Sequence, residues 1–162
     1  MKITLNIEPG DALGGSLYYV GSEYSFRFDV GSPVDIEDRA TNASVSSLLI
    51  GTLQINVAIE TGILLYVWGY HPNLQWQTET LENPKYESGI VRLDHPETLR
   101  KGVSLGIAKV GDWTTISDPD SGWIRVASSE RLDERQVLIA SDVVLGISDS
   151  ELCSVWLRPV YD

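Results

Sequence analysis

The sequence has few of the residues that build common scaffolds and catalytic sites. It holds one cysteine, Cys153, so no disulfide can form within the chain and a secreted scaffold built on disulfides is excluded. Its two histidines, His71 and His95, are too few for a three-histidine zinc site. No H-E-x-x-H or C-x-x-C spacing, nucleophile elbow or phosphate-binding glycine loop occurs. We therefore expect no cofactor, no metal and no catalytic residue, and a protein that is not an enzyme.

Positive charge is also scarce. Twelve Lys and Arg residues stand against 23 Asp and Glu residues, which gives a net charge of −11. This balance argues against a nucleic-acid partner and against an anionic membrane surface, because both need clustered basic side chains. It favours a basic protein partner, and it is equally compatible with a role in solubility alone.

Long apolar runs are missing too. No stretch approaches the roughly 20 residues of a membrane-spanning helix. The first residues, Met1–Pro9, alternate between apolar and polar and soon reach an acidic residue, which is unlike a signal peptide. The expected location is the cytoplasm.

What the sequence does contain is a period of two, which predicts half-buried strands. Leu53–Ile59 alternates, Glu60–Gly62 forms a turn in which Gly62 takes a positive φ, and Ile63–Tyr70 is a central strand covered on both faces. Further strands are expected at Lys2–Glu8, Ser16–Val20, Tyr24–Val30, Gly89–Leu93, Val103–Val110, Trp113–Ile116, Trp123–Ala127, Val137–Ala140, Val143–Ile147 and Leu152–Leu157.

Helical patterns are few and short. We expect one turn of helix at His95–Arg100 and short helices within Ile36–Leu49 and Ser129–Gln136. The chain is thus predicted to be a single domain, residues 1–162, and mainly β. Its architecture is expected to be an antiparallel sandwich, an open barrel or a large curved sheet with at most one or two short helices. An α+β fold is the alternative.

Two segments repeat the same apolar pattern. The first series is Ile55, Val57, Ile59, Leu64, Val67 and Trp68, and the second is Val143, Leu145, Ile147, Leu152, Val155 and Trp156, at identical spacings. Either the chain holds two related hairpins, or the likeness is only the general likeness of all hairpins. In both interpretations Trp68 and Trp156 are expected in the core, while Trp76, Trp113 and Trp123 flank loops and are the better surface candidates.

The candidate binding residues are acidic side chains in predicted loops. Asp35, Glu37 and Asp38 form one group, and Asp118 and Asp120 form another, with Trp123 as a neighbouring aromatic anchor. Such groups can pair with Lys and Arg of a basic partner, or they can simply be a solvated surface.

Two segments resemble proteins of one functional class. Leu53–Trp76, which contains the run Leu64–Pro72, and Val143–Pro159 look similar to acidic immunity proteins encoded beside bacterial polymorphic and contact-dependent toxins. The resemblance implies a cytoplasmic inhibitor of a cognate toxin, in many cases a basic nuclease. Immunity proteins have many unrelated folds, so no binding residue is transferred.

The sequence leaves three hypotheses about the function of this protein. The leading hypothesis is a non-enzymatic immunity protein that occludes the active site of a toxin with its acidic loops. The second is a carbohydrate- or small-ligand-binding β-sandwich, and the third is a hydrolase that uses paired carboxylates.

Overall fold

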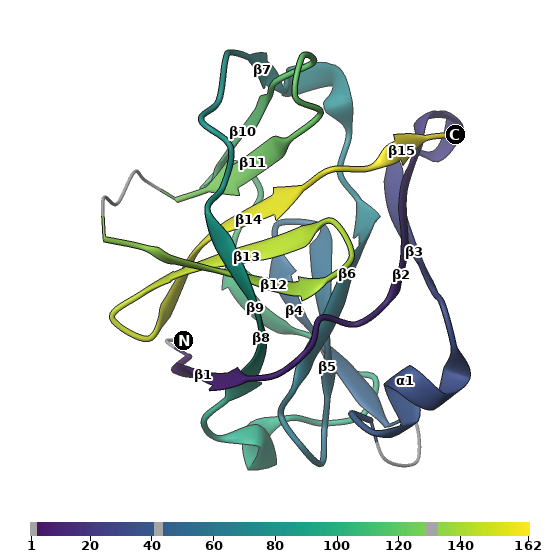
Figure 1. Cartoon of the computed structure of the whole chain (residues 1–162), viewed down its shortest axis with the longest axis vertical. Coiled ribbons are helices and arrows are strands. Elements are labelled where there is room, and N and C mark those ends of the chain that lie inside the picture. Colours follow the sequence, from purple (N-terminus) through teal and green to yellow (C-terminus); the bar gives the residue numbers. More distant parts are fainter. Residues whose placement is uncertain (1–2, 41–43, 129–132) are drawn as a thin grey trace.

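The computed structural model describes residues 3–40, 44–128 and 133–162 (Figure 1). Its one α-helix in these ranges is α1 (Pro33–Glu37), and its short 3-10 helices are η1 (Gly21–Glu23), η3 (Asn73–Gln75) and η4 (Pro96–Thr98). The strands are β1 (Leu5–Pro9), β2 (Gly15–Val20), β3 (Ser25–Val30), β4 (Val45–Ile50), β5 (Leu53–Ala58), β6 (Leu64–Tyr70), β7 (Gln77–Thr78), β8 (Tyr86–Leu93), β9 (Leu105–Ala108), β10 (Thr114–Ser117), β11 (Ile124–Ala127), β12 (Arg135–Ala140), β13 (Val143–Ser148), β14 (Glu151–Leu157) and β15 (Val160–Tyr161).

These strands form two sheets. One has the order β1-β8-β12-β13-β14-β11-β10-β7, and the other has the order β15-β2-β3-β6-β5-β4-β9. The predicted mainly-β fold is confirmed. The sheets are mixed rather than wholly antiparallel, since β7, β8, β9 and β15 each pair in parallel with a neighbouring strand.

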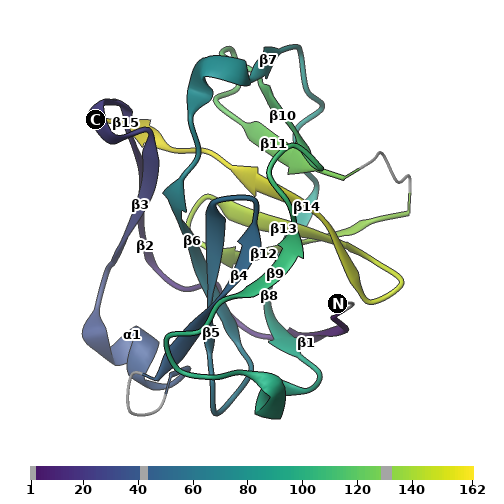
Figure 2. The same cartoon turned by 180° about the vertical axis from the view of Figure 1, so that it is seen from behind.

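The main hydrophobic core lies between the two sheets. Figures 1 and 2 show β12–β14 and β4–β6 crossing face to face at a steep angle. Each strand sends alternate apolar side chains into this layer, and Leu53, Ile55, Leu65, Leu145 and Val155 have no exposed surface. Two isolated bridges, Ile63 with Arg92 and Leu13 with Ala140, connect the sheets at their margins.

The two sheets are built on the same five-stranded unit. The N-terminal unit, residues 15–70, has the order β2-β3-β6-β5-β4, and the C-terminal unit, residues 114–157, has the order β10-β11-β14-β13-β12. All neighbours within each unit are antiparallel. The two hairpins noticed in the sequence, β5–β6 and β13–β14, therefore occupy equivalent places.

The sequence alignment of these hairpins holds for the second strand only. Trp68 lies opposite Gln54, and Trp156 lies opposite Val144. In the first strand, however, Ile55 is equivalent to Leu145 and not to Val143. The cause is the turn, because Asp149 and Ser150 alone, both with positive φ, join β13 to β14, whereas the β5–β6 turn is longer.

Each unit lends strands to the sheet of the other. After the N-terminal unit, β7 pairs in parallel with β10, and after the C-terminal unit, β15 pairs in parallel with β2. The segments that precede the two units also pair with the sheet of the other unit. β9, before the C-terminal unit, pairs with β4, and Leu13, just before β2, bridges to Ala140 of β12.

Two helix predictions are wrong where the structure describes them. Within Ile36–Leu49, α1 ends at Glu37 and β4 begins at Val45, because Leu48 and Ile50 alternate into the core beside β5. Of Ser129–Gln136, residues 129–132 lie outside the described residues, and Arg135 already belongs to β12. The helical turn expected at His95–Arg100 is present as η4.

Candidate functional site

The outer face of β6 carries a row of aromatic side chains. Tyr66, Trp68 and Tyr70 alternate with Leu65 and Val67, which point into the core. Trp68 is 36% exposed and Tyr70 is 51% exposed. The expectation that Trp68 is a core residue is therefore wrong. The nearly continuous apolar run suggested cover on both faces, but the outer face is partly covered only at Tyr66, which stacks on Phe28, and is open at Trp68 and Tyr70.

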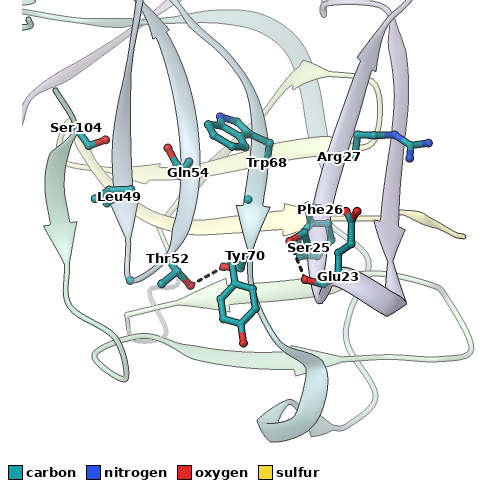
Figure 3. Close-up of a pocket in the computed structure, with 12 residues that line it drawn as sticks. Glu23, Ser25, Phe26, Arg27, Leu49, Thr52, Gln54, Trp68, Tyr70 and Ser104 are labelled. Atoms are coloured by element: carbon teal, nitrogen blue, oxygen red, sulfur yellow. Dashed lines mark hydrogen bonds between the residues drawn. The ribbon is translucent and has the colours of Figure 1, made fainter. Parts of the chain in front are cut away.

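An open cavity lies beside this row (Figure 3). Its volume is about 670 Å³. Its lining comes from the outer faces of β3, β4, β5 and β6 and from adjoining turns. It consists of Glu23, Ser25, Phe26, Arg27, Leu49, Gly51, Thr52, Gln54, Trp68, Gly69, Tyr70 and Ser104. We call the surface formed by Ser25, Arg27, Leu49, Gln54, Trp68 and Tyr70 the aromatic face.

Trp68 is held in place by hydrogen bonds behind the ring. Its indole N–H donates to Oδ1 of Asn56 at 2.5 Å. The Asn56 side chain, 8% exposed, donates in turn to the hydroxyl of Tyr66 at 3.0 Å, and Ser47 donates to Oδ1 of Asn56 at 3.4 Å. Because the polar edge of the indole is already satisfied within the protein, its exposed surface is left for apolar contact.

Neighbouring groups stabilise the backbone around Tyr70. The hydroxyl of Thr52 donates to the carbonyl oxygen of Tyr70 at 2.5 Å, and the hydroxyl of Ser25 donates to the carbonyl oxygen of Glu23 at 3.0 Å. Figure 3 shows both bonds at the edge of the cavity. The aromatic face is thus built on sheet strands with fixed side-chain partners, which suits a preformed binding surface.

Arg27 is turned away from Trp68 in Figure 3. Its guanidinium lies over the ring of Tyr18, 4.6 Å from the ring centre, and pairs with Asp29 at 3.3 Å and Asp162 at 3.6 Å. These carboxylates offset the charge of Arg27. With the exposed Glu23, they give this side of the aromatic face a negative balance.

The predicted acidic groups do not come together. Asp35 and Glu37 lie on α1 and Asp38 follows it, all three exposed, whereas Asp118 and Asp120 lie in the turn between β10 and β11. Figures 1 and 2 place these two regions at opposite ends of the molecule. A single acidic surface made from both groups is therefore not formed.

Asp118 is also engaged within the fold. Its carboxylate, 4% exposed, accepts the N–H of Leu81 at 2.9 Å and the N–H of Asp120 at 3.0 Å. These bonds, that from Leu81 first, lower the pKa of Asp118 below its ordinary value. Asp118 thus stabilises a turn and anchors a distant segment, while Asp120 remains exposed.

Trp123 is 2% exposed, so the expectation that it is a surface anchor is wrong. It packs with Val144 and Trp156 in a second apolar cluster on the outer face of the eight-stranded sheet. Leu81, from the segment between β7 and β8, packs against this cluster. Trp156 is buried as expected, but in this outer cluster and not in the main core.

No known protein family matches the chain, and no curated protein matches it either. Within the residues that the structure describes, no helix is long and apolar enough to cross a membrane. Across the same ranges, no group of three His, Cys, Asp or Glu side chains is arranged to hold a metal ion.

Proposed function

We propose that this chain is a non-enzymatic binding protein that recognises a protein partner through the aromatic face. The observation that carries the proposal is the pair Trp68 and Tyr70, both exposed beside a cavity of about 670 Å³ on a firmly hydrogen-bonded sheet. Tryptophan and tyrosine supply much of the binding energy at protein interfaces, since each buries a large area and loses little side-chain entropy.

Within this class we favour an immunity-type inhibitor of a basic partner. The net charge of −11 and the resemblance of Leu53–Trp76 to immunity proteins both support it. The separated acidic groups act at long range in this proposal: they speed the encounter with a basic protein, and the aromatic face then holds it. Salt should slow association more than it speeds dissociation.

A small-ligand or carbohydrate site is the second candidate, favoured by the volume of the cavity. About 670 Å³ falls within the roughly 300–1,000 Å³ of ordinary ligand pockets. The cavity is open to solvent, however, and such pockets usually enclose most of the ligand. Among the described residues that line it, Glu23 is the only carboxylate, which gives little support to a mechanism that needs two.

The proposal is tested by titrating the purified protein with the product of the adjacent gene in an isothermal calorimeter. Trp68→Ala and Tyr70→Ala should each weaken binding by about 30-fold or more, because truncating an interface hot spot costs at least about 2 kcal/mol. Tyr86→Ala is the matched control, since Tyr86 is 40% exposed on the other sheet, and it should leave the affinity unchanged.

Two outcomes would contradict this proposal. One is unchanged affinity in Trp68→Ala together with loss of binding in an Asp35→Asn, Asp38→Asn double variant, which would move the interface to α1. The other is quenching of tryptophan fluorescence by members of an oligosaccharide panel without any protein binding, which would support the second candidate.

A further inference from the structure

The outer faces of the two units can be compared position by position. On β6, Trp68 lies opposite Gln54, which lies opposite Leu49 of β4. On β14, Trp156 lies opposite Val144, which lies opposite Leu138 of β12. The aromatic face and the outer cluster around Trp156 are therefore the same surface of the repeated unit.

In the C-terminal unit this surface is covered by a stretch of the chain itself. Residues 79–85 leave β7 and cross in front of β14, β13 and β12 to reach β8 (Figure 1). This stretch contains no helix, turn or bend. Its Leu81 packs on the cluster of Trp123, Val144 and Trp156, and its Pro84 is buried.

Side-chain oxygens of β12 and of the turn between β10 and β11 hold the backbone of this covering stretch. The N–H of Leu81 donates to the carboxylate of Asp118 at 2.9 Å, and the N–H of Lys85 donates to Oε1 of Gln136 at 2.7 Å. The unit thus binds a peptide without helix or turn through Leu81 and the buried Pro84, and through side chains that accept two of its amides.

In the N-terminal unit no described segment makes this crossing. When the pairing of β11 with β14 is continued by one residue beyond Ile124, Ser25 of β3 is found at the position that Trp123 has in the other unit. Gln54 replaces Val144 in the same way. Ser25 and Gln54 both line the open cavity, so it lies where the second unit holds a tryptophan ring and an apolar contact.

Arg27 and Arg125 hold equivalent positions in the two units, and they have different partners. Arg125 lies over the ring of Trp156, 5.7 Å from its centre. Arg27 instead lies over Tyr18 and pairs with Asp29 and Asp162. This arrangement leaves the outer surface of Trp68 without the cation that Trp156 has, and it places the carboxylates of Asp29 and Asp162 beside Arg27.

We propose that the aromatic face binds an extended segment of a partner polypeptide, which places one large apolar side chain in the cavity beside Trp68. The inference rests on the proposed function and specifies how the partner is recognised. The amide of Gln54 lines the cavity and would bond the peptide backbone there, at the position of Val144 and not at that of Gln136. Glu23, Asp29 and Asp162 favour Lys or Arg next to the apolar anchor.

The test uses a random peptide library displayed on phage and selected against the full-length protein. Enriched peptides should share one large apolar residue flanked by basic residues, and they should compete with the protein partner. Ser25→Trp restores the ring that the other unit carries, fills the cavity and should weaken peptide binding by about tenfold or more. Ser88→Trp, at an exposed position of β8 in the other sheet, is the matched control and should bind as wild type.

Circular dichroism and the melting temperature establish that both tryptophan variants fold. If Ser25→Trp does not fold, Gln54→Val takes its place, because it replaces the amide with the apolar side chain that Val144 provides in the other unit and should also weaken peptide binding. The inference is overturned, and the proposed function kept, if the partner loses affinity in Trp68→Ala but no competing peptide is enriched, because recognition would then use a folded surface. It is overturned together with the proposed function if Trp68→Ala leaves partner binding unchanged.

Discussion

At the scale of single residues, burial decides the charge of His71. Its ring packs against Trp76 and Phe26, and its Nε2 lies 2.8 Å from the hydroxyl of Thr115. Desolvation disfavours the protonated ring and lowers the pKa of His71 from 6.5 to about 4. The folded protein therefore holds a neutral imidazole at pH values where an unfolded chain would be protonated.

This difference predicts a loss of stability in mild acid. Between pH 6.5 and about 4 the unfolded state binds one proton more at His71, so the free energy of unfolding falls as the pH is lowered through this range. The full difference corresponds to about 3 kcal/mol, at about 1.4 kcal/mol for each pH unit. Urea unfolding of the wild type and of His71→Asn at a series of pH values measures it, and the variant should show the weaker dependence.

The second histidine provides the control. The side chain of His95 is 72% exposed and lacks the burial that acts on His71, so His95→Asn is the matched histidine variant. Equal slopes in wild type and His71→Asn would mean that His71 is protonated in the folded state as readily as in water.

At the scale of elements, the β5–β6 hairpin was the most predictable part of the fold. Alternation in Leu53–Ile59 and the position of Gly62 predicted two strands and a turn with positive φ, and Gly62 has a φ of +77°. A Cβ at Gly62 would lie 2.8 Å from the carbonyl oxygen of Leu93, and the carbonyl of Gly62 accepts the N–H of Leu93 at 2.7 Å. The turn is thus also a contact with β8 of the other sheet.

Alanine substitution at two glycines separates the cost of a positive φ from the cost of the contact between Gly62 and Leu93. Gly111 has a φ of +89°, and a Cβ added there would meet no atom within 4 Å, so Gly111→Ala should lower the free energy of unfolding by about 1–2 kcal/mol, the cost of the left-handed conformation. Gly62→Ala should cost about 1–3 kcal/mol more than Gly111→Ala, because the methyl group meets the Leu93 carbonyl. Denaturant titration of both variants measures the difference, and equal losses would show that the β8 contact is not strained.

The candidate site was much less predictable than the hairpin, for a physical reason. Trp68 and Trp156 have the same local pattern, and alternation correctly assigns both to the side opposite Val67 and Val155. For Trp156 the cover comes from residues 79–85, which lie far before β13 and β14 in the sequence, and for Trp68 no described segment supplies it. Local periodicity describes which way a side chain points, and it carries no information on what a remote segment places above it.

At the scale of the whole molecule, the units are interlocked by the strands that they exchange. The seven-stranded sheet needs β9 and β15 from the C-terminal part, and the eight-stranded sheet needs β7 and β8 from the chain that follows the N-terminal unit. One continuous core joins both. Unfolding one unit would therefore strip edge strands from the other and expose its half of the core.

This arrangement predicts a single cooperative unfolding transition. Leu145→Ala, at a fully buried position of the C-terminal unit, should cost about 2–5 kcal/mol. Hydrogen exchange in increasing denaturant should show the same loss for amides of β5–β6 as for amides of β13–β14, because both open in the same event. Val110→Ala, at a 78% exposed position, should leave both sets unchanged. If the β5–β6 amides kept their wild-type protection in Leu145→Ala, the units would unfold independently, and the exchanged strands would add little to the coupling between the two sheets.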